Sequence, residues 1–222
     1  MGIITIDKAD HLYWLGRYTE RVHTTLKLFF VDFDRMIDRS ENAYQEMCKA
    51  LNIPDVYGSK QCFITHYPYD TKDPNSILSN LMRSYDNALV MRDEIGTLTM
   101  SYIQLAIYDM EKAKSSDAPI IALQDVVDHI LAFWGCVDDA IDDEKTRSLI
   151  KAGKRIERLD LMLCLDSDIQ SIRRECRKLE RRLPRIGLSY DKEALERFKE
   201  QIEQENFNRF SAIHDLESIL VL

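Results

Sequence analysis

The chain has 222 residues, of which 45% are hydrophobic and 31% charged, and this supplies the core of one domain or two small ones. Its formal net charge of −8 disfavours nucleic acid as a partner. The five cysteines are widely spaced and form no CxxC pair, which indicates reduced thiols rather than a disulfide framework or a metal site.

Nothing in the chain predicts export or a membrane anchor. The opening "MGIITIDKAD" has neither the basic start nor the long apolar stretch of a signal peptide. We expect no membrane-spanning helix, because no apolar run approaches the ~20 residues that a span needs. A cytoplasmic protein is expected, and without a glycine-rich phosphate loop no cofactor is predicted.

Apolar residues recur at helical spacing along the first half of the chain. They predict a first helix over residues 8–38, which could continue to about residue 51. Residues 52–75 hold three of the five prolines and predict an ordered connection rather than a helix. A second helix is expected to about residue 113, with Asp73 or Asn75 as its N-cap and a kink near Gly96.

The second half predicts four more helices, over about 120–137, 145–165, 166–183 and 189–220. The acidic link "DDAIDDE" separates the first two, and Pro184 and Gly187 end the third. Glycine and proline are scarce, 7 and 5 residues, which favours long helices, and no segment alternates as strands do. The sequence therefore predicts an all-α fold, a single helical domain over 1–222 built as an antiparallel bundle.

A short phrase occurs twice in the chain, as "GRYTER" at 16–21 and "GKRIER" at 153–158, which places the copies 137 positions apart (153 minus 16). Each copy has a glycine one helical turn before a glutamate, and leucines around it match at the same offset. A glycine inside a helix costs up to about 1 kcal/mol relative to alanine. Gly16 and Gly153 therefore indicate a close helix approach, and the repeat predicts a pseudo-two-fold relation between the two motif helices.

The repeated glutamates have a structural interpretation. If the two helices cross near their glycines, a base of one helix can satisfy the buried carboxylate of the other. The predicted reciprocal pairs are Glu20 with Lys154 or Arg158, and Glu157 with Arg17 or Arg21. Each glutamate could instead pair with a base three residues earlier on its own helix, which contributes only about 0.2–0.5 kcal/mol.

The same residues also allow a functional interpretation. Glu20 and Glu157 would be catalytic acid and base, or metal ligands, in a site between the motif helices. The bases beside them would then bind an anionic ligand. Tyr13 and Trp14 would either pack between helices or form the wall of that pocket.

Three blocks of the chain, in order, carry a resemblance to a known family. They are "LYWLGRYTERVHTTLKLF", "DPNSILSNLMRSYDNALVMRDEI" and "FWGCVDDAIDDEKTRSLIKAGKRIERLDLML". Together they resemble the bacterial alpha-E proteins, named for an α-helical domain with a Glu-Arg motif, over nearly the whole chain. The middle block resembles the family's Glu-Asn-Ala…Val-Arg-Asp run, which corresponds here to Asp86, Asn87, Ala88, Met91, Arg92 and Asp93. The resemblance therefore adds Arg92 to the candidate anion-binding residues. Lys154-Arg155-Ile156 departs from the more usual Arg-Tyr-Leu.

The resemblance implies a context and no reaction. Alpha-E proteins resemble one another in their gene neighbourhoods. The neighbouring genes encode circularly permuted ATP-grasp enzymes, which form amide bonds, and transglutaminase-like peptidases. We therefore expect an accessory or interaction subunit of an ATP-grasp-linked system that forms or modifies peptides, with those two proteins as partners. The alternative is an enzyme or ligand-binding protein with its site between the two Glu-Arg helices. Substrate, product and self-association into a homo-oligomer are left open.

Two further motifs each allow a structural and a functional interpretation. Asp138, Asp139 and Asp142 match the DDxxD box in which prenyl synthases hold Mg²⁺, a remote alternative to a solvated link with helix-capping acids. The run "RRECRKLERRLPR" at 173–185 predicts either a solvated face or a docking strip for an acidic partner or phosphorylated ligand.

Overall fold

The computed structural model describes residues 5–38, 42–204 and 206–222, and all regular elements in these ranges are helices. This confirms the predicted all-α class. In chain order the helices are α1 (Ile6–Asp38), α2 (Ala43–Ala50), α3 (Lys60–His66), α4 (Ile77–Val90), α5 (Arg92–Ile95), α6 (Thr97–Lys114), α7 (Pro119–Asp139), α8 (Glu144–Cys164), α9 (Ile169–Arg182), the 3-10 turn η1 (Leu183–Arg185), α10 (Lys192–Glu203) and α11 (Arg209–Ser218).

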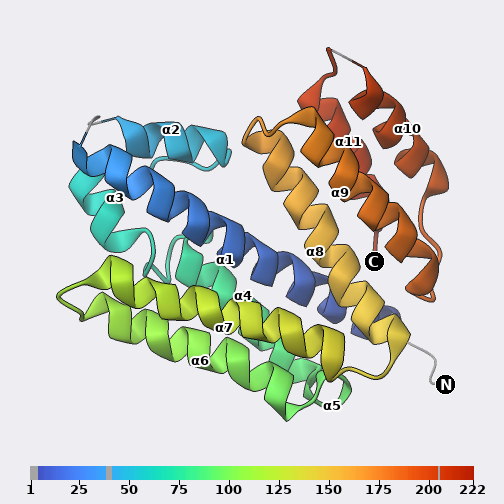
Figure 1. Cartoon of the computed structure of the whole chain (residues 1–222), viewed down its shortest axis with the longest axis horizontal. Coiled ribbons are helices and arrows are strands. Elements are labelled where there is room, and N and C mark those ends of the chain that lie inside the picture. The colour runs from blue at the N-terminus through green and yellow to red at the C-terminus, as the bar shows by residue number, and fades with distance from the viewer. Residues whose placement is uncertain (1–4, 39–41, 205) are drawn as a thin grey trace.

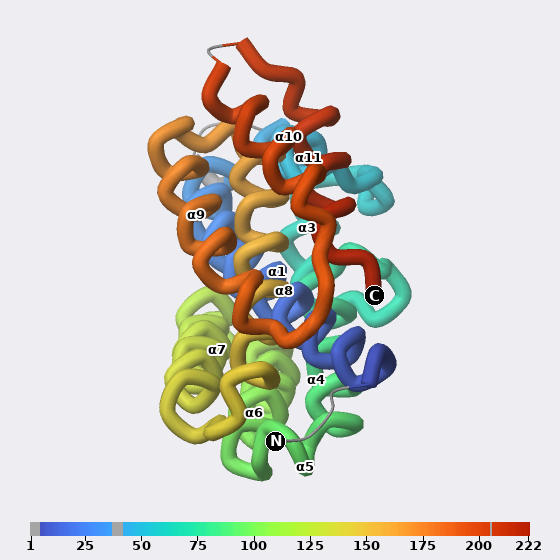
Figure 2. The backbone as a smooth tube through the Cα atoms, turned by 90° about the vertical axis from the view of Figure 1, so that its right-hand side faces the viewer, coloured from blue at the N-terminus to red at the C-terminus, as the bar shows by residue number. Residues whose placement is uncertain are grey.

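The two motif helices, α1 and α8, cross at the centre of the molecule (Figure 1). Helices α4, α6 and α7 form a layer on one side of this pair, with α4 packed on α1 and α6 packed on both α4 and α7. Helices α9, α10 and α11 cover the other side, where α9 and α11 contact α8 (Figure 2). Helices α2 and α3 lie beside the carboxyl-terminal half of α1.

The apolar stripe of α1 faces the interior as its spacing predicts. Leu12, Leu15, Val22 and Leu26 are at most 1% exposed. Leucines of α8, among them Leu149, Leu159 and Leu163, are buried to the same degree. Burying such side chains stabilises the fold by roughly 1.5–3 kcal/mol each, so this packing holds the two motif helices at the centre.

Local side-chain chemistry sets where most helices begin. Among the described helices, six start after a residue whose side chain accepts the backbone N–H three positions on: Ser59, Ser76, Asp143, Asp168, Asp191 and Asn208. The N-cap of α4 is therefore Ser76, and the expectation of Asp73 or Asn75 was wrong. The Asp73 carboxylate instead accepts the backbone N–H of Asn75 at 2.8 Å, which forms a turn before the helix.

Two long predicted helices are divided in the structure. The segment expected to kink near Gly96 forms α4, α5 and α6, because Gly96 adopts φ +80°, a conformation that ends a helix and lets α6 pack back against α4. The segment expected as one helix over 189–220 forms α10 and α11, and Asn208 caps the second of them. Both divisions depend on local chain reversals that helical periodicity alone does not reveal.

The connection expected over 52–75 contains a helix, α3. Ser59 caps it by accepting the backbone N–H of Cys62 at 3.2 Å. Phe63 is fully buried and stacks on Tyr67 with the ring centroids 4.6 Å apart. Seven residues are too few to show a helical period, so tertiary burial of Phe63 and Tyr67 decides this element.

Helix α7 is long and apolar enough to cross a membrane by length and composition, with a mean hydropathy of 1.5 in its best window. The sequence-based expectation that no segment reaches this range was therefore too strict. It is weak evidence for a span, because a core helix of a globular protein meets the same two conditions. Here 39% of that window is buried within the protein, and α7 packs against α6.

Candidate functional site: the crossing of the Glu-Arg helices

The backbones of α1 and α8 touch at the two motif glycines. A Cβ atom added to Gly16 would overlap the carbonyl oxygen of Ile150, and one added to Gly153 would overlap the carbonyl oxygen of Tyr13. The contact is reciprocal, because Tyr13 and Ile150 occupy matching positions in the two phrases. Only glycine permits this approach, and it brings the glutamate of each helix alongside the other helix. A two-fold relation between the complete helices stays a prediction.

Glu157 is closed inside an interhelical ion-pair cluster. Its carboxylate is 1% exposed and accepts hydrogen bonds from Arg17 Nε at 2.7 Å and from Arg21 Nε. Asp160 Oδ2 lies 3.5 Å from the Nη2 atoms of both Arg17 and Arg21. Two bases thus face two acids, and the pairing offsets the several kcal/mol that an unpaired buried charge would cost.

Glu20 is equally buried but less completely paired. It is fully buried, and its Oε1 accepts a hydrogen bond from Arg158 Nε at 2.6 Å and from Thr24 Oγ1 at 3.4 Å. Its Oε2 has no hydrogen-bond partner among the described residues. Burial favours the neutral acid, but the His23 ring and the Arg158 guanidinium outweigh it, and the pKa of Glu20 is lowered.

Lys154 occupies the position that Arg17 occupies in the first phrase, and it does not reproduce the contacts of that arginine. Its Nζ lies 3.6 Å from the centroid of the Trp134 ring, a cation–π contact. Burial lowers the pKa of Lys154 to about 7, against the opposing effect of Glu20. Lysine lacks the planar fork of a guanidinium. Glu20 therefore accepts a hydrogen bond from one arginine of the other helix, whereas Glu157 accepts hydrogen bonds from two.

The aromatic residues beside the first phrase surround the Arg17 guanidinium. Its central carbon lies 5.1 Å from the Trp14 ring centroid and 5.9 Å from that of Tyr13. Trp14 also stacks on Tyr18 with ring centroids 5.2 Å apart. Tyr13 and Trp14 therefore pack around the charge and hold it in register with Glu157.

The structure does not bring every predicted site residue to the crossing. Arg92 lies exposed at the start of α5, and its ion pair is with the adjacent Asp93 at 3.8 Å. Asp138 pairs with Lys151, and α7 ends at Asp139, so Asp138 and Asp142 do not lie on one helix. Within the described ranges no group of three or more His, Cys, Asp or Glu side chains is placed to hold a metal ion.

Two acidic residues join the site without a signal in the repeated phrase. Asp160 lies two residues after Arg158, just beyond the repeated phrase, and Glu217 on α11 approaches Arg17 at 3.8 Å. Burial and the charge of Glu157 raise the pKa of Asp160 to about 6. A cavity of about 370 Å³ opens beside them and is lined by Arg21, Asp160, Arg209 and Glu217, among others. Helical spacing could have suggested Asp160, whereas Glu217 required the tertiary structure.

The fold and the site define an all-α protein whose two central helices cross at paired glycines and exchange Glu-Arg ion pairs. Residues 8–175 match the model of the Alpha-E family, described as a predicted alpha-helical domain with a conserved ER motif. The chain belongs to the Alpha-E family. The match ends within α9, so α10 and α11 lie beyond it. Comparison with curated proteins and with solved structures found no significant match.

Proposed function

We propose that this Alpha-E protein is an accessory, interaction subunit of an ATP-grasp-linked system that forms or modifies peptides. Its partners would be a circularly permuted ATP-grasp protein and a transglutaminase-like protein, as the resemblance to alpha-E proteins implies. We place the complex in the cytoplasm, where the ATP-grasp partner has access to ATP.

The observation that carries the proposal is the closure of both motif glutamates. Glu20 and Glu157 are at most 1% exposed, and each carboxylate accepts a hydrogen bond from an arginine of the opposite helix. A carboxylate in this position meets no substrate, and its ion pairs join the two central helices. The Glu-Arg motif then serves as a structural lock, which favours a scaffold over an independent catalyst.

Exposed apolar side chains on the outer layer support the interaction role. On α6, Leu98 and Tyr108 are 58% and 65% exposed, and on α7 Ile121 is 76% exposed and Leu131 49%. Tyrosine is a frequent anchor of protein interfaces, and the buried core of an interface is more apolar than the rest of a protein surface. The α6–α7 layer is therefore the surface that we assign to the partner.

Co-purification tests this proposal. The tagged chain, expressed in its native host, should retain the ATP-grasp protein encoded beside it. Ile121→Glu should reduce that recovery at least about tenfold, because it places a charge in the apolar contact. Val221→Glu is the matched control, since Val221 is 84% exposed but lies at the carboxyl end of the chain. Recovery of no ATP-grasp neighbour by the unaltered chain would contradict the accessory role.

A second candidate, a ligand-binding role, is favoured by the cavity beside Asp160. Both acids and bases line it, which suits a zwitterion such as a free dipeptide. Calorimetry with alanylalanine should then show saturable binding that Glu217→Gln weakens and Glu193→Gln leaves unchanged. Absence of saturable binding would remove this candidate and leave the accessory role untouched.

A further inference from the structure

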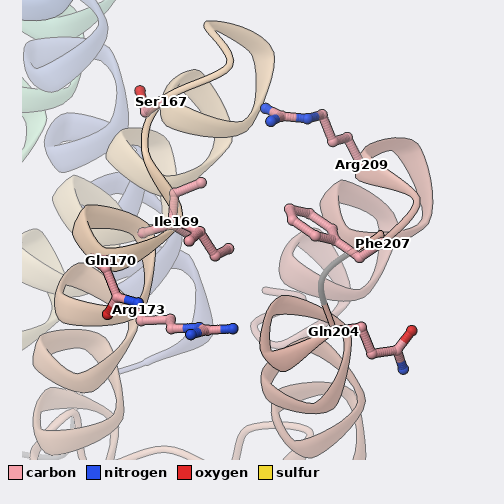
Figure 3. Close-up of a pocket in the computed structure, with 8 residues that line it drawn as sticks. Ser167, Ile169, Gln170, Arg173, Gln204, Phe207 and Arg209 are labelled. Carbon is pink, nitrogen blue, oxygen red and sulfur yellow. The ribbon is translucent and has the colours of Figure 1, made fainter.

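A second cavity, of about 380 Å³, lies where the region that matches the Alpha-E family model meets the helices beyond it. One wall is the corner between α8 and α9, with Ile169, Ile172 and Arg173. The other wall is the connection from α10 to α11, with Phe207 and Arg209. Figure 3 shows the guanidinium groups of Arg173 and Arg209 reaching into this space from opposite walls, with the Phe207 ring between them.

Main-chain carbonyl groups hold Arg173 in place. Its Nε donates to the carbonyl oxygen of Ile202 at 2.9 Å and its Nη2 to that of Glu203 at 3.0 Å, at the carboxyl end of α10. These bonds link α9 to α10 and fix the guanidinium without neutralising it. Three further N–H donors of the guanidinium belong to Nη1 and Nη2, so Arg173 keeps hydrogen-bonding capacity for a ligand.

Arg209 is held in a similar way on the opposite wall. Its Nη1 donates to the carbonyl oxygen of Leu163 at 2.8 Å, at the end of α8, and its guanidinium carbon lies 5.6 Å from the Phe207 ring centroid. The bland interpretation is that both arginines only tie helix ends together. Both ties line one cavity, and none of the described residues in its lining is acidic, so two positive charges lie beside the same space.

The acids that accompany these arginines stand outside the cavity. Asp166 pairs with Arg209, and Glu203 lies 3.4 Å from Arg173. Their side chains are 82% and 66% exposed, so water screens both pairs strongly. They compete with an incoming anion and do not block it.

We propose that this cavity binds a phosphate monoester of a planar, aromatic alcohol. A phosphate dianion can accept parallel hydrogen bonds from the Arg209 guanidinium, and Arg173 on the opposite wall adds a second positive charge to the lining of the cavity. Together these two charges favour a dianion over a single carboxylate. The side chains of Ile169, Ile172 and Phe207 offer an apolar surface for the ring of such a ligand. Arg173 belongs to the basic run at 173–185, and this site gives one residue of that run a specific role.

Calorimetry with phenyl phosphate as the probe tests the site, with benzoate and inorganic phosphate as comparisons. Phenyl phosphate should bind most tightly, because benzoate lacks the second charge and inorganic phosphate lacks the ring. Arg209→Gln should weaken the binding of phenyl phosphate at least tenfold. Arg185→Gln is the matched control, since Arg185 also pairs with one exposed acid, Glu144, but lies on η1 away from the cavity.

Asp166→Asn provides a test that does not depend on removing an arginine. Asp166 is exposed, so the variant keeps the fold, and the loss of a competing charge should strengthen phenyl phosphate binding several-fold. Unchanged affinity in Asp166→Asn and Arg209→Gln, benzoate equal to phenyl phosphate, or no saturable binding by the unaltered chain would each overturn the proposal. Recovery of the ATP-grasp partner is a separate readout, because the cavity includes no residue of α6 or α7.

Discussion

At the scale of single residues, the two motif glutamates have unequal environments. Glu157 accepts from two arginines, and both of its oxygens are used. Glu20 accepts from Arg158 through one oxygen, while Lys154 turns to the Trp134 ring. The phrase is repeated in sequence, but one substitution of lysine for arginine makes the first ion-pair cluster stronger than the second.

We expect Glu157→Gln to lower the free energy of unfolding by about 3–5 kcal/mol, because it leaves the buried Arg17 and the partly exposed Arg21 facing a neutral group. Glu20→Gln should cost roughly half as much, since Arg158 is partly exposed and lies 4.0 Å from Glu175. Urea denaturation at pH 7 measures both values. Glu46→Gln, at an exposed ion pair with Arg35, is the control and should change stability by less than about 1 kcal/mol. If Glu157→Gln and Glu46→Gln lowered the free energy of unfolding equally, the ion pairs between the motif helices would not have the structural role that we assign to them.

Lys154 predicts a dependence of stability on pH. Burial lowers the pKa of Lys154 in the folded chain to about 7, whereas an ordinary lysine has a pKa of 10.5, so between these pH values the unfolded chain binds one more proton than the folded chain. The free energy of unfolding contributed by Lys154 therefore rises with pH through this window, and below pH 7 the full cost of burying the charge applies.

Lys154→Met removes that titration. We expect the variant to be more stable than the natural chain at pH 6.5, and the difference to shrink by about 1 kcal/mol or more by pH 9.5. Urea midpoints at several pH values give the comparison. If the difference in stability between the two chains stayed constant from pH 6.5 to pH 9.5, burial would not lower the pKa of Lys154 into this range.

At the scale of elements, the crossing of α1 and α8 depends on two missing side chains. Gly16 and Gly153 each face a carbonyl oxygen of the other helix, and this contact sets the depth at which the glutamates meet their arginines. Gly135 in α7 is the internal comparison, because a Cβ there would meet no atom within 4 Å.

Gly16→Ala and Gly153→Ala should each destabilise the protein by about 3 kcal/mol, because the helices must separate to admit the new methyl group. Gly135→Ala should instead raise the free energy of unfolding by about 0.5–1 kcal/mol, as expected for an exposed helix position. Thermal or urea unfolding of the three variants distinguishes these effects. A stabilising Gly16→Ala would show that the helices do not touch there.

The helices themselves followed from the sequence to different degrees. The motif helices were predicted at 8–38 and 145–165 and lie at 6–38 and 144–164, because a long amphipathic period and local caps define them. The divisions at Gly96 and before Asn208, and the short helix α3, were missed. Each depends on a backbone reversal or on burial of a few residues, which the period of neighbouring segments hides.

At the scale of the whole molecule, α8 connects the helices inside and outside the family match. It packs on α1, on α9 and on α11. In α11 and the residue that follows it, Ala212, Leu216 and Ile219 are fully buried. The terminal helices therefore share a core with the matched region, and one domain over residues 1–222 stays a prediction.

We expect a single cooperative unfolding transition. Fluorescence of Trp14 and Trp134 reports the motif region, and hydrogen exchange of amides in α10 and α11 reports the terminal helices. Both should give the same free energy of unfolding. Exchange in α10 and α11 at a free energy several kcal/mol lower would mean that these helices form a separate unit.

The sequence by itself determined the helical class, the two motif helices and the family, because periodicity, caps and the repeated phrase are local properties of the chain. Only the tertiary structure decided which oxygen of each glutamate meets which arginine, why Lys154 sits on Trp134, and that Asp160 and Glu217 join the cluster. It alone also brought Arg173 and Arg209 to one cavity. The physical reason is that charge pairs and cavities depend on distances between helices, and packing of the whole molecule sets those distances.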